Sequence, residues 1–224
     1  MKLNGFLVNL GLAVALFDQT IHGQQSVVED REIANTRAKA KSGEADAQFL
    51  LGYYYAVGQG LPKDEAEAVK WYRKAAEQNL AAAQFNLGSC YDNGHGVTKN
   101  MAEAVKWYRK AADQNLAEAQ FNLGVCYKRG EGVAQNEVEA VKWYRKAAEQ
   151  NYANAQFNLG LCCIRAQGLA RDDVEGYKWL LLSSAQDFEQ AKDAVTKLEA
   201  ALSPEEIAEG KRRANNWLKQ HKKS

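Results

Sequence analysis

The sequence predicts an all-α fold, a solenoid of stacked helix pairs, on three observations. The string Ala-Val-Lys-Trp-Tyr-Arg-Lys-Ala-Ala at 104–112 recurs at 68–76 and 140–148, and a worn copy begins at Gly176, so that a tryptophan returns every 36 residues. A period of this length is typical of repeat proteins whose units bury their apolar faces only by stacking. The body of the chain is also rich in Ala, Glu, Lys, Gln and Arg, which favour helices.

The first 23 residues differ from this body. Lys2 precedes an apolar run from Phe6 to Phe17, and a polar segment follows up to Gly23. The pattern predicts a secretory signal peptide at 1–23, since the run is too short to span a bilayer comfortably. We therefore expect an exported chain, periplasmic or secreted, with no membrane span after cleavage. The alternative is an N-terminal helix that is retained, either buried or disordered.

Three further segments follow the signal peptide. Residues 24–43 are expected to form a linker and an N-terminal capping helix, because Arg37-Ala38-Lys39-Ala40 matches the Arg-Lys-Ala-Ala of the later copies. Residues 44–187 predict four repeats of 36 residues. Residues 188–224 predict a C-terminal capping helix pair and a basic tail, with Ser203 and Pro204 opening the last helix and Trp217 as its anchor.

The first helix of each repeat carries an apolar face at a spacing of four residues, as at Ala83, Leu87 and Tyr91. A glycine follows the leucine in every copy, as at Gly88, although glycine disfavours a helix interior by roughly 1 kcal/mol relative to alanine. We expect a packing reason, namely that the missing Cβ lets bulky side chains of the second helix come close. The helix should end at a left-handed glycine cap, which Ala166 replaces in the fourth copy, where we expect strain or a different closure.

The second helix of each repeat is expected to begin at a capping box, in which two side chains satisfy free backbone amides reciprocally. An Asp or Asn is followed three residues later by Glu at Asp64–Glu67, Asn100–Glu103, Asn136–Glu139 and Asp172–Glu175. The helix then closes at an asparagine that tolerates the left-handed turn, at Asn79, Asn115 and Asn151. These polar residues are therefore interpreted as structural.

A family resemblance rests on the full repeat motif. The pattern Ala-x-x-x-Leu-Gly-x-x-Tyr-x-x-Gly-x-Gly-Val from Ala83 to Val97, followed by Ala-x-x-Trp-Tyr-x-Lys-Ala-Ala, resembles the Sel1-like repeat, a relative of the tetratricopeptide repeat. The resemblance covers roughly residues 47–185. It implies a right-handed α-solenoid of stacked antiparallel helix pairs, and an adaptor that binds an unknown protein or peptide.

One branch of that family differs from this chain in its cysteines. Its secreted, cysteine-rich members pair the end of one repeat with the start of the next, where this chain has Ala112 and Ala119, and they are associated with β-lactam binding and hydrolysis. The cysteines here are Cys90, Cys126, Cys162 and Cys163. We expect them to be small buried thiols, because packed helices lie about 8–10 Å apart, too far for a disulfide in most geometries. A cell-envelope enzyme of the β-lactamase-associated type, or a binder of a cell-wall polymer, is the alternative to a scaffold.

The sequence contains no convergent set of reactive groups. The net charge of +1 and the lack of a basic patch beyond the tail argue against nucleic acid. The three histidines have no metal-ligand spacing with Cys, Asp or Glu, and no Ser-x-x-Lys nucleophile motif occurs. The Gly-x-Gly loops follow helices and lack Gly-Lys-Ser/Thr, so they are not phosphate loops. We expect no enzyme, no catalytic residue, no cofactor and no metal.

On a helical wheel, a phenylalanine and the asparagine after it lie on the side of the first helix away from its apolar face. The candidate partner-binding residues are Phe49, Phe85, Asn86, Phe121, Asn122, Phe157 and Asn158. In one interpretation they line a concave groove that captures an extended peptide or a helix of a partner protein. In the other, each Phe packs on the neighbouring first helix and each Asn joins adjacent units.

Overall fold

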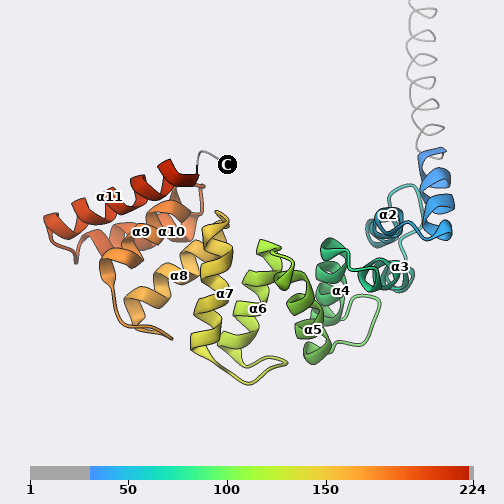
Figure 1. The fold of residues 1–224 in the computed structure, drawn as a ribbon, viewed down its shortest axis with the longest axis horizontal. Coiled ribbons are helices and arrows are strands. Elements are labelled where there is room, and N and C mark those ends of the chain that lie inside the picture. The colour runs from blue at the N-terminus through green and yellow to red at the C-terminus, as the bar shows by residue number, and fades with distance from the viewer. Residues whose placement is uncertain (1–30, 222–224) are drawn as a thin grey trace, which may run out of the picture. The chain divides into compact units, whose positions relative to one another are not determined.

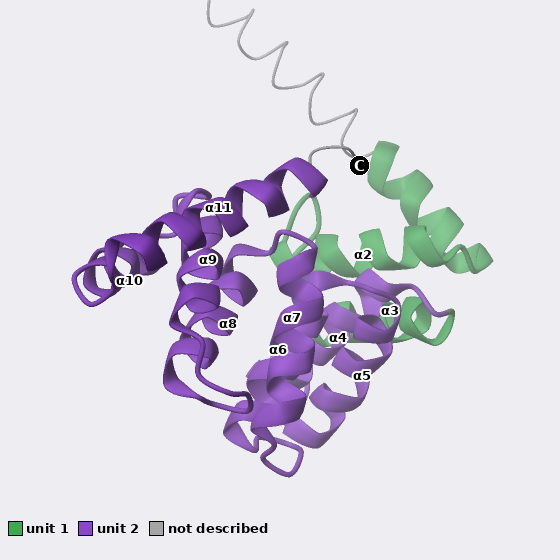
Figure 2. Cartoon of the chain, turned by 60° about the vertical axis from the view of Figure 1, so that its left-hand side comes forward, with its two compact units in different colours: residues 1–78 green, residues 79–224 purple. Residues whose placement is uncertain are grey.

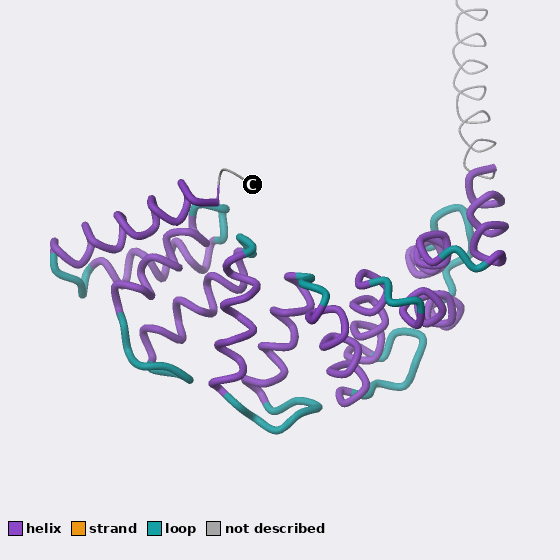
Figure 3. The backbone as a smooth tube through the Cα atoms, viewed as in Figure 1, coloured by secondary structure: helices purple, strands orange, loops and turns teal. Residues whose placement is uncertain are grey.

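A computed structural model describes residues 31–221, and these residues form helices and loops with no strand (Figures 1 and 3). Residues 31–42 are helical, and ten further helices follow. Their bounds are α2 Ala45–Val57, α3 Glu65–Glu77, α4 Ala81–Asn93, α5 Met101–Asp113, α6 Ala117–Arg129, α7 Glu137–Glu149, α8 Ala153–Arg165, α9 Asp173–Ser184, α10 Glu189–Glu199 and α11 Pro204–His221. Consecutive helices pack as pairs, which confirms the all-α fold of stacked helix pairs.

The chain divides into two compact units (Figure 2). The first unit, up to Gln78, contains the pair α2–α3, and the second, from Asn79, contains the pairs α4–α5, α6–α7 and α8–α9 followed by α10 and α11. The predicted signal peptide and the first residues of the predicted linker lie outside the described residues. Among residues 31–221, no helix combines the length and the apolar character needed to cross a membrane.

The glycine that follows each leucine is a point of close contact between the two helices of a repeat. A Cβ built on Gly88 would lie 2.8 Å from the Tyr108 ring, and one on Gly124 would lie 2.7 Å from the Tyr144 ring. Cβ atoms do not approach other carbon atoms this closely. The packing reason expected from the sequence is confirmed, and the bulky side chain is the residue that follows the repeated tryptophan, a tyrosine in the first three repeats and Leu180 in the fourth.

The repeated tryptophan of the third and fourth repeats packs against the preceding repeat. Trp143 of α7 is 7% exposed and belongs to one cluster with Val105, Tyr108 and Ala112 of α5. The ammonium group of Lys146 lies 4.1 Å from the centre of the indole ring, a distance at which a cation is attracted to an aromatic face. The indole Nε1 has no hydrogen-bond partner among the described residues. Trp143 therefore contributes mainly apolar contact.

The predicted left-handed turns are present. Gly94 and Gly130 close α4 and α6 with φ of 78° and 71°, and Asn115 has φ of 68°. Ala166 closes α8 with φ of 55°, so the fourth repeat keeps the same closure with a residue that has a Cβ. A residue with a Cβ is strained in the left-handed region of backbone conformation, so the strain expected for the cap at Ala166 is present.

The capping boxes of the second helices are only half formed, which corrects the sequence prediction. The Asn100 side chain accepts from the Glu103 amide at 3.1 Å, as expected, and the other three repeats do the same. The amide of Asn100, however, donates to the carbonyl oxygen of Tyr91 at the end of the preceding helix, at 2.8 Å. Glu103 therefore turns to Lys106 instead, at 2.5 Å. Only the box of Ser203 and Glu206 is reciprocal within the described residues.

A ladder of glutamine and asparagine side chains joins the repeats, and sequence analysis missed it. Gln120 of α6 is 1% exposed and donates to the Ala112 carbonyl at 3.2 Å and to Asn115 Oδ1 at 3.0 Å. Gln150, which follows α7, donates to the same Asn115 at 3.2 Å and to Gln120 Oε1 at 2.8 Å. Because buried amides are stable only when they are hydrogen-bonded, this ladder fixes the register of one repeat on the next.

The loops after α6 and α8 rest on the preceding repeat. Gly132 follows α6 with φ of 72°, and a Cβ built on it would lie 2.2 Å from the carbonyl oxygen of Met101, the first residue of α5. Gly168 stands in the same relation to Glu137 of α7, at 2.3 Å. The second glycine of Gly-x-Gly is therefore required by a contact between backbones.

The last two helices both pack on α9 and have few contacts with each other. They do not form a pair of the kind seen in the repeats. Trp217 of α11 is buried, 6% exposed, and lies against Trp179 of α9 with ring centroids 6.0 Å apart. Its indole Nε1 donates to Glu149 Oε2 at 2.8 Å, at the end of α7. Trp217 is thus the anchor that the sequence predicted.

Candidate interaction site

The predicted phenylalanines lie half-buried on the first helices, and those of the first three repeats each contact a tyrosine of their own repeat. Phe85 and Phe121 of the second unit lie with ring centroids 5.8 Å from those of Tyr108 and Tyr144. Phe49 of the first unit has the same relation to the following helix. The helical wheel did not anticipate these tyrosine contacts. They leave part of each ring accessible to a partner.

Phe157, the last of the predicted row, lies at an apolar hollow. The hollow has a volume of about 460 Å³, and its walls include Phe157, Leu161 and Ile164 of α8 and Leu198 of α10. Phe157 also contacts Phe188, at 5.2 Å between ring centroids. Charged side chains of Arg165, Asp193 and Lys197 also line the hollow. This combination of an apolar floor and a few polar groups is common in binding sites.

The predicted asparagines make different contacts from one repeat to the next. Asn122 of α6 lies near the Tyr108 hydroxyl of the preceding repeat, so this contact is between repeats. Asn158 Nδ2 instead donates within its own helix, to the Asn154 carbonyl at 2.9 Å. The Tyr108 hydroxyl also donates to Asp92 Oδ2 at 3.1 Å. Burial, followed by this carboxylate, raises the pKa of Tyr108 far above its ordinary value, so the phenol stays a neutral donor.

The name Phe–Asn face is used below for Phe85, Asn86, Phe121, Asn122, Phe157 and Asn158, which lie in the second unit. The structure brings Phe121 and Asn122 beside tyrosines of two successive second helices. Phe49 lies in the other unit and is described separately. That these residues bind a partner stays a prediction.

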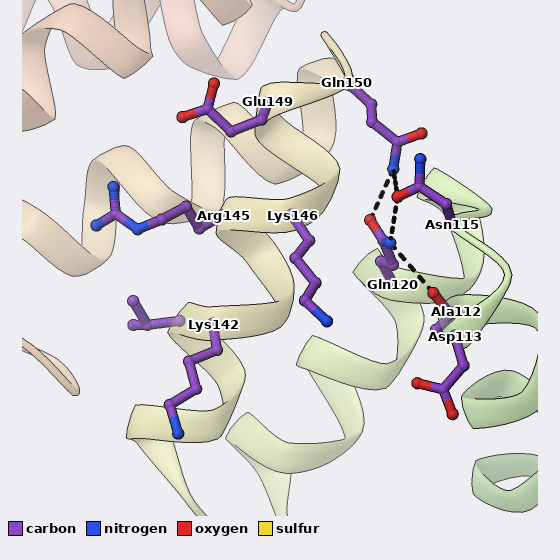
Figure 4. Close-up of a pocket in the computed structure, with 10 residues that line it drawn as sticks. Ala112, Asp113, Asn115, Gln120, Lys142, Arg145, Lys146, Glu149 and Gln150 are labelled. Carbon is purple, nitrogen blue, oxygen red and sulfur yellow. Dashed lines mark hydrogen bonds between the residues drawn. The ribbon is translucent and has the colours of Figure 1, made fainter.

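A second hollow lies on the second helices, between the end of α5 and the length of α7 (Figure 4). Its volume is about 670 Å³. Lys142, Arg145 and Lys146 of α7 line this hollow. Lys146 projects toward the hydrogen-bonded ladder of Gln150, Asn115 and Gln120, whereas Arg145 extends from the opposite side of α7 (Figure 4). We call it the α5–α7 hollow. Sequence analysis did not single out this surface.

Cys126, Cys162 and Cys163 are buried thiols outside any disulfide, as predicted, whereas Cys90 is only partly buried and departs from the prediction. Burial raises the pKa of Cys126 to about 12 and that of Cys163 to about 11, and it also raises the pKa of Cys162. A thiol reacts through its thiolate. These three side chains are therefore poor nucleophiles near neutral pH. Within residues 31–221, no three His, Cys, Asp or Glu side chains are grouped to hold a metal ion.

The burial predicts the order in which the thiols react. We expect a disulfide reagent at pH 8 to modify Cys90 of the folded protein first, because Cys90 is partly exposed and the other three thiols are buried. In denaturant, all four cysteines should react at once. Rapid reaction of four thiols in the folded protein would contradict the burial, and fewer than four in denaturant would reveal a disulfide.

The comparison with protein families matches four successive segments of the chain. The Sel1 repeat is found at residues 45–80, 81–116, 117–152 and 153–188, which together make up more than half of the sequence. The chain belongs to the Sel1 repeat family. Proteins of this family are in general protein-interaction scaffolds and non-enzymatic. No curated protein matches this chain.

Two solved Sel1 repeat structures are similar to this one. The protective antigen c5321 of uropathogenic Escherichia coli strains is 37% identical, with a TM-score of 0.75 over 82% of this chain and 40% of the antigen. A Sel1 repeat protein from Oxalobacter formigenes is 29% identical, with a TM-score of 0.70 over 76% of this chain and 50% of that protein. The present chain thus spans half or less of the length of either.

Proposed function

We propose that this Sel1 repeat chain is an exported scaffold whose Phe–Asn face captures an extended peptide or a helix of a partner protein. The observation that carries the proposal is the apolar hollow at Phe157, which continues a row of half-exposed phenylalanines at equivalent places in successive repeats. Aromatic rings in a row can hold apolar side chains of a partner, and neighbouring amides can pair with its backbone. In this proposal the chain is not an enzyme and takes no cofactor.

Replacing Phe85 and Phe121 together is the test of this face. Because both rings contact tyrosines, we choose Phe85→Leu with Phe121→Leu, which keeps apolar packing and removes the aromatic surface. The partner is first captured from the envelope fraction of the source cell and identified by mass spectrometry. We expect the double variant to bind the purified partner at least about tenfold more weakly, a change of about 1.4 kcal/mol.

The matched control is Val138→Ala, which removes an exposed apolar side chain from α7. It should leave the affinity unchanged. Circular dichroism and the unfolding midpoint should be similar for both variants. An unchanged affinity in the folded double leucine variant would eliminate the Phe–Asn face as the capture surface.

Export is proposed from the sequence pattern of residues 1–23, namely a short apolar run behind Lys2. We expect the mature chain to begin at Gln24 when it is expressed in its own cell. Mass spectrometry of the purified protein measures this start directly. A mature chain that begins at Met1 would contradict the proposal for export and leave the binding experiment unaffected.

A further inference from the structure

The helix α11 packs on α9, the second helix of the fourth repeat (Figure 1). This packing shows how a helix can bind to the surface formed by the second helices. Trp217 makes an edge contact with Trp179 of α9 and donates its indole N–H to Glu149 at the end of α7. Gly210 lies so close to Tyr177 of α9 that a Cβ would be 2.4 Å from the ring. The helix is therefore held by one aromatic anchor, one carboxylate acceptor and a close approach.

Two positions of α9 that are apolar in the fourth repeat are occupied by charged residues at the equivalent positions of the third repeat. Leu182 is 2% exposed, and the half-buried Leu181 packs in the same cluster, which includes Trp217. One period of 36 residues earlier, the same two places hold Arg145 and Lys146, both exposed. The fourth repeat thus departs from the repeated string where α11 covers it, because a buried unpaired cation would be unfavourable.

The α5–α7 hollow is the equivalent place one repeat earlier. Its wall contains Ala112 and Asp113, which correspond to Ala148 and Glu149 beneath Trp217. Within residues 31–221, no helix lies on it as α11 lies on α9. The repeat therefore presents the same carboxylate position and the same small residue, and no helix within residues 31–221 occupies it.

The charges of the hollow decide what would fit there. Lys142 is paired with Glu139 at 2.5 Å, and Glu149 already accepts from Trp217. The Arg145 guanidinium has no hydrogen bond or ion pair with any residue in 31–221, and Lys146 lies over an indole ring. Two cations are thus available on α7, one on each side of the helix, and Asp113 is available on the wall formed by α5.

We propose that the α5–α7 hollow docks a helix of a partner protein that carries carboxylates toward Arg145 and Lys146 and an aromatic side chain toward Asp113. The mode is that of α11 on α9, with ion pairs in place of the contacts to Leu181 and Leu182. Complementary charges across such an interface select the partner. The surface belongs to the second helices of the repeats, so it is separate from the Phe–Asn face.

The test uses two synthetic peptides as probes of the full chain. One is residues 203–221 of this protein, and the other is the same peptide with Leu218→Glu. Leu218 and Leu181 both pack against the cluster that contains Leu182. We choose position 218 for the carboxylate because the proposal places its counterpart near Arg145 and Lys146. We expect the Leu218→Glu peptide to bind at least about tenfold more tightly than the unmodified peptide in fluorescence anisotropy.

The matched variant is Arg145→Leu with Lys146→Leu, which reproduces the residues of the fourth repeat at these two places. We expect the preference to reverse, with the unmodified peptide bound more tightly by about tenfold. The Phe85→Leu and Phe121→Leu variant should keep the original preference, which separates this proposal from that for the Phe–Asn face. Circular dichroism checks that both variants are folded.

Two results would overturn the proposal. The first is that the unmodified chain binds both peptides equally or not at all. The same holds if the Arg145→Leu and Lys146→Leu variant still prefers the Leu218→Glu peptide. The other is self-association of the chain alone, measured by sedimentation at the same concentration, that is lost in the Arg145→Leu and Lys146→Leu variant. That second result would assign the hollow to a second copy of this chain.

Discussion

Replacing Trp143 by alanine is expected to lower the free energy of unfolding by about 3–5 kcal/mol. The indole is 7% exposed and fills the space between α7 and the residues Val105, Tyr108 and Ala112 of α5. Its loss would leave a cavity between two repeats, and each repeat is stabilised chiefly by its neighbours. Chemical denaturation followed by circular dichroism measures the change.

Trp143→Phe is the control for this prediction. The indole N–H has no hydrogen-bond partner among the described residues, so phenylalanine removes apolar contact without breaking a hydrogen bond. We expect Trp143→Phe to retain most of the stability that Trp143→Ala loses. A Trp143→Ala protein as stable as the original would show that the indole faces solvent.

Replacing Gly132 by alanine should lower the free energy of unfolding by about 2–5 kcal/mol, combining a left-handed backbone with overpacking. The backbone has φ of 72°, and the added Cβ would lie 2.2 Å from the Met101 carbonyl oxygen, which belongs to the first turn of α5. Neither group can move without shifting a loop or a helix. Thermal and chemical unfolding of the variant test this value.

Gly130→Ala is the matched control, two residues earlier in the same loop. Its φ of 71° is similar, but the contacts of the added Cβ would be longer, at 3.1 Å from the Cβ and 3.4 Å from the backbone N of Gln135. The fourth repeat has Ala166 at the corresponding place. We therefore expect Gly130→Ala to cost about 1–2 kcal/mol, which is the strain of the backbone alone. Equal losses for the two variants would refute the contact with Met101.

The fold could be predicted largely from local signals. The helix pairs follow from a fixed period, and the left-handed turns at Gly94 and Asn115 follow from the residue types that tolerate them. The second half of each capping box could not be predicted in this way. It depends on where the Asn100 amide points in space, and that direction is set by the carbonyl of Tyr91 at the end of another helix.

The glutamine–asparagine ladder and the two candidate surfaces could likewise not be predicted without the tertiary structure. Gln120 and Gln150 resemble exposed helix residues in the sequence, and only their pairing across repeats explains the burial of Gln120. The helical wheel placed Phe121 correctly on a partly accessible side but gave no indication of Tyr144 beneath it. For the α5–α7 hollow, one signal was present in the sequence: the change from Arg and Lys to Leu181 and Leu182 in the worn copy.

The ladder also determines how such a gene can lengthen. Each rung uses the same side chains on both sides of a junction, so an in-frame duplication of residues 117–152 would meet matching partners at its old and new boundaries. The fourth repeat cannot be duplicated in this way, because a copy placed away from α11 would expose Leu181 and Leu182 to water. Duplication of the third repeat therefore preserves solubility, whereas the fourth repeat must stay next to α11.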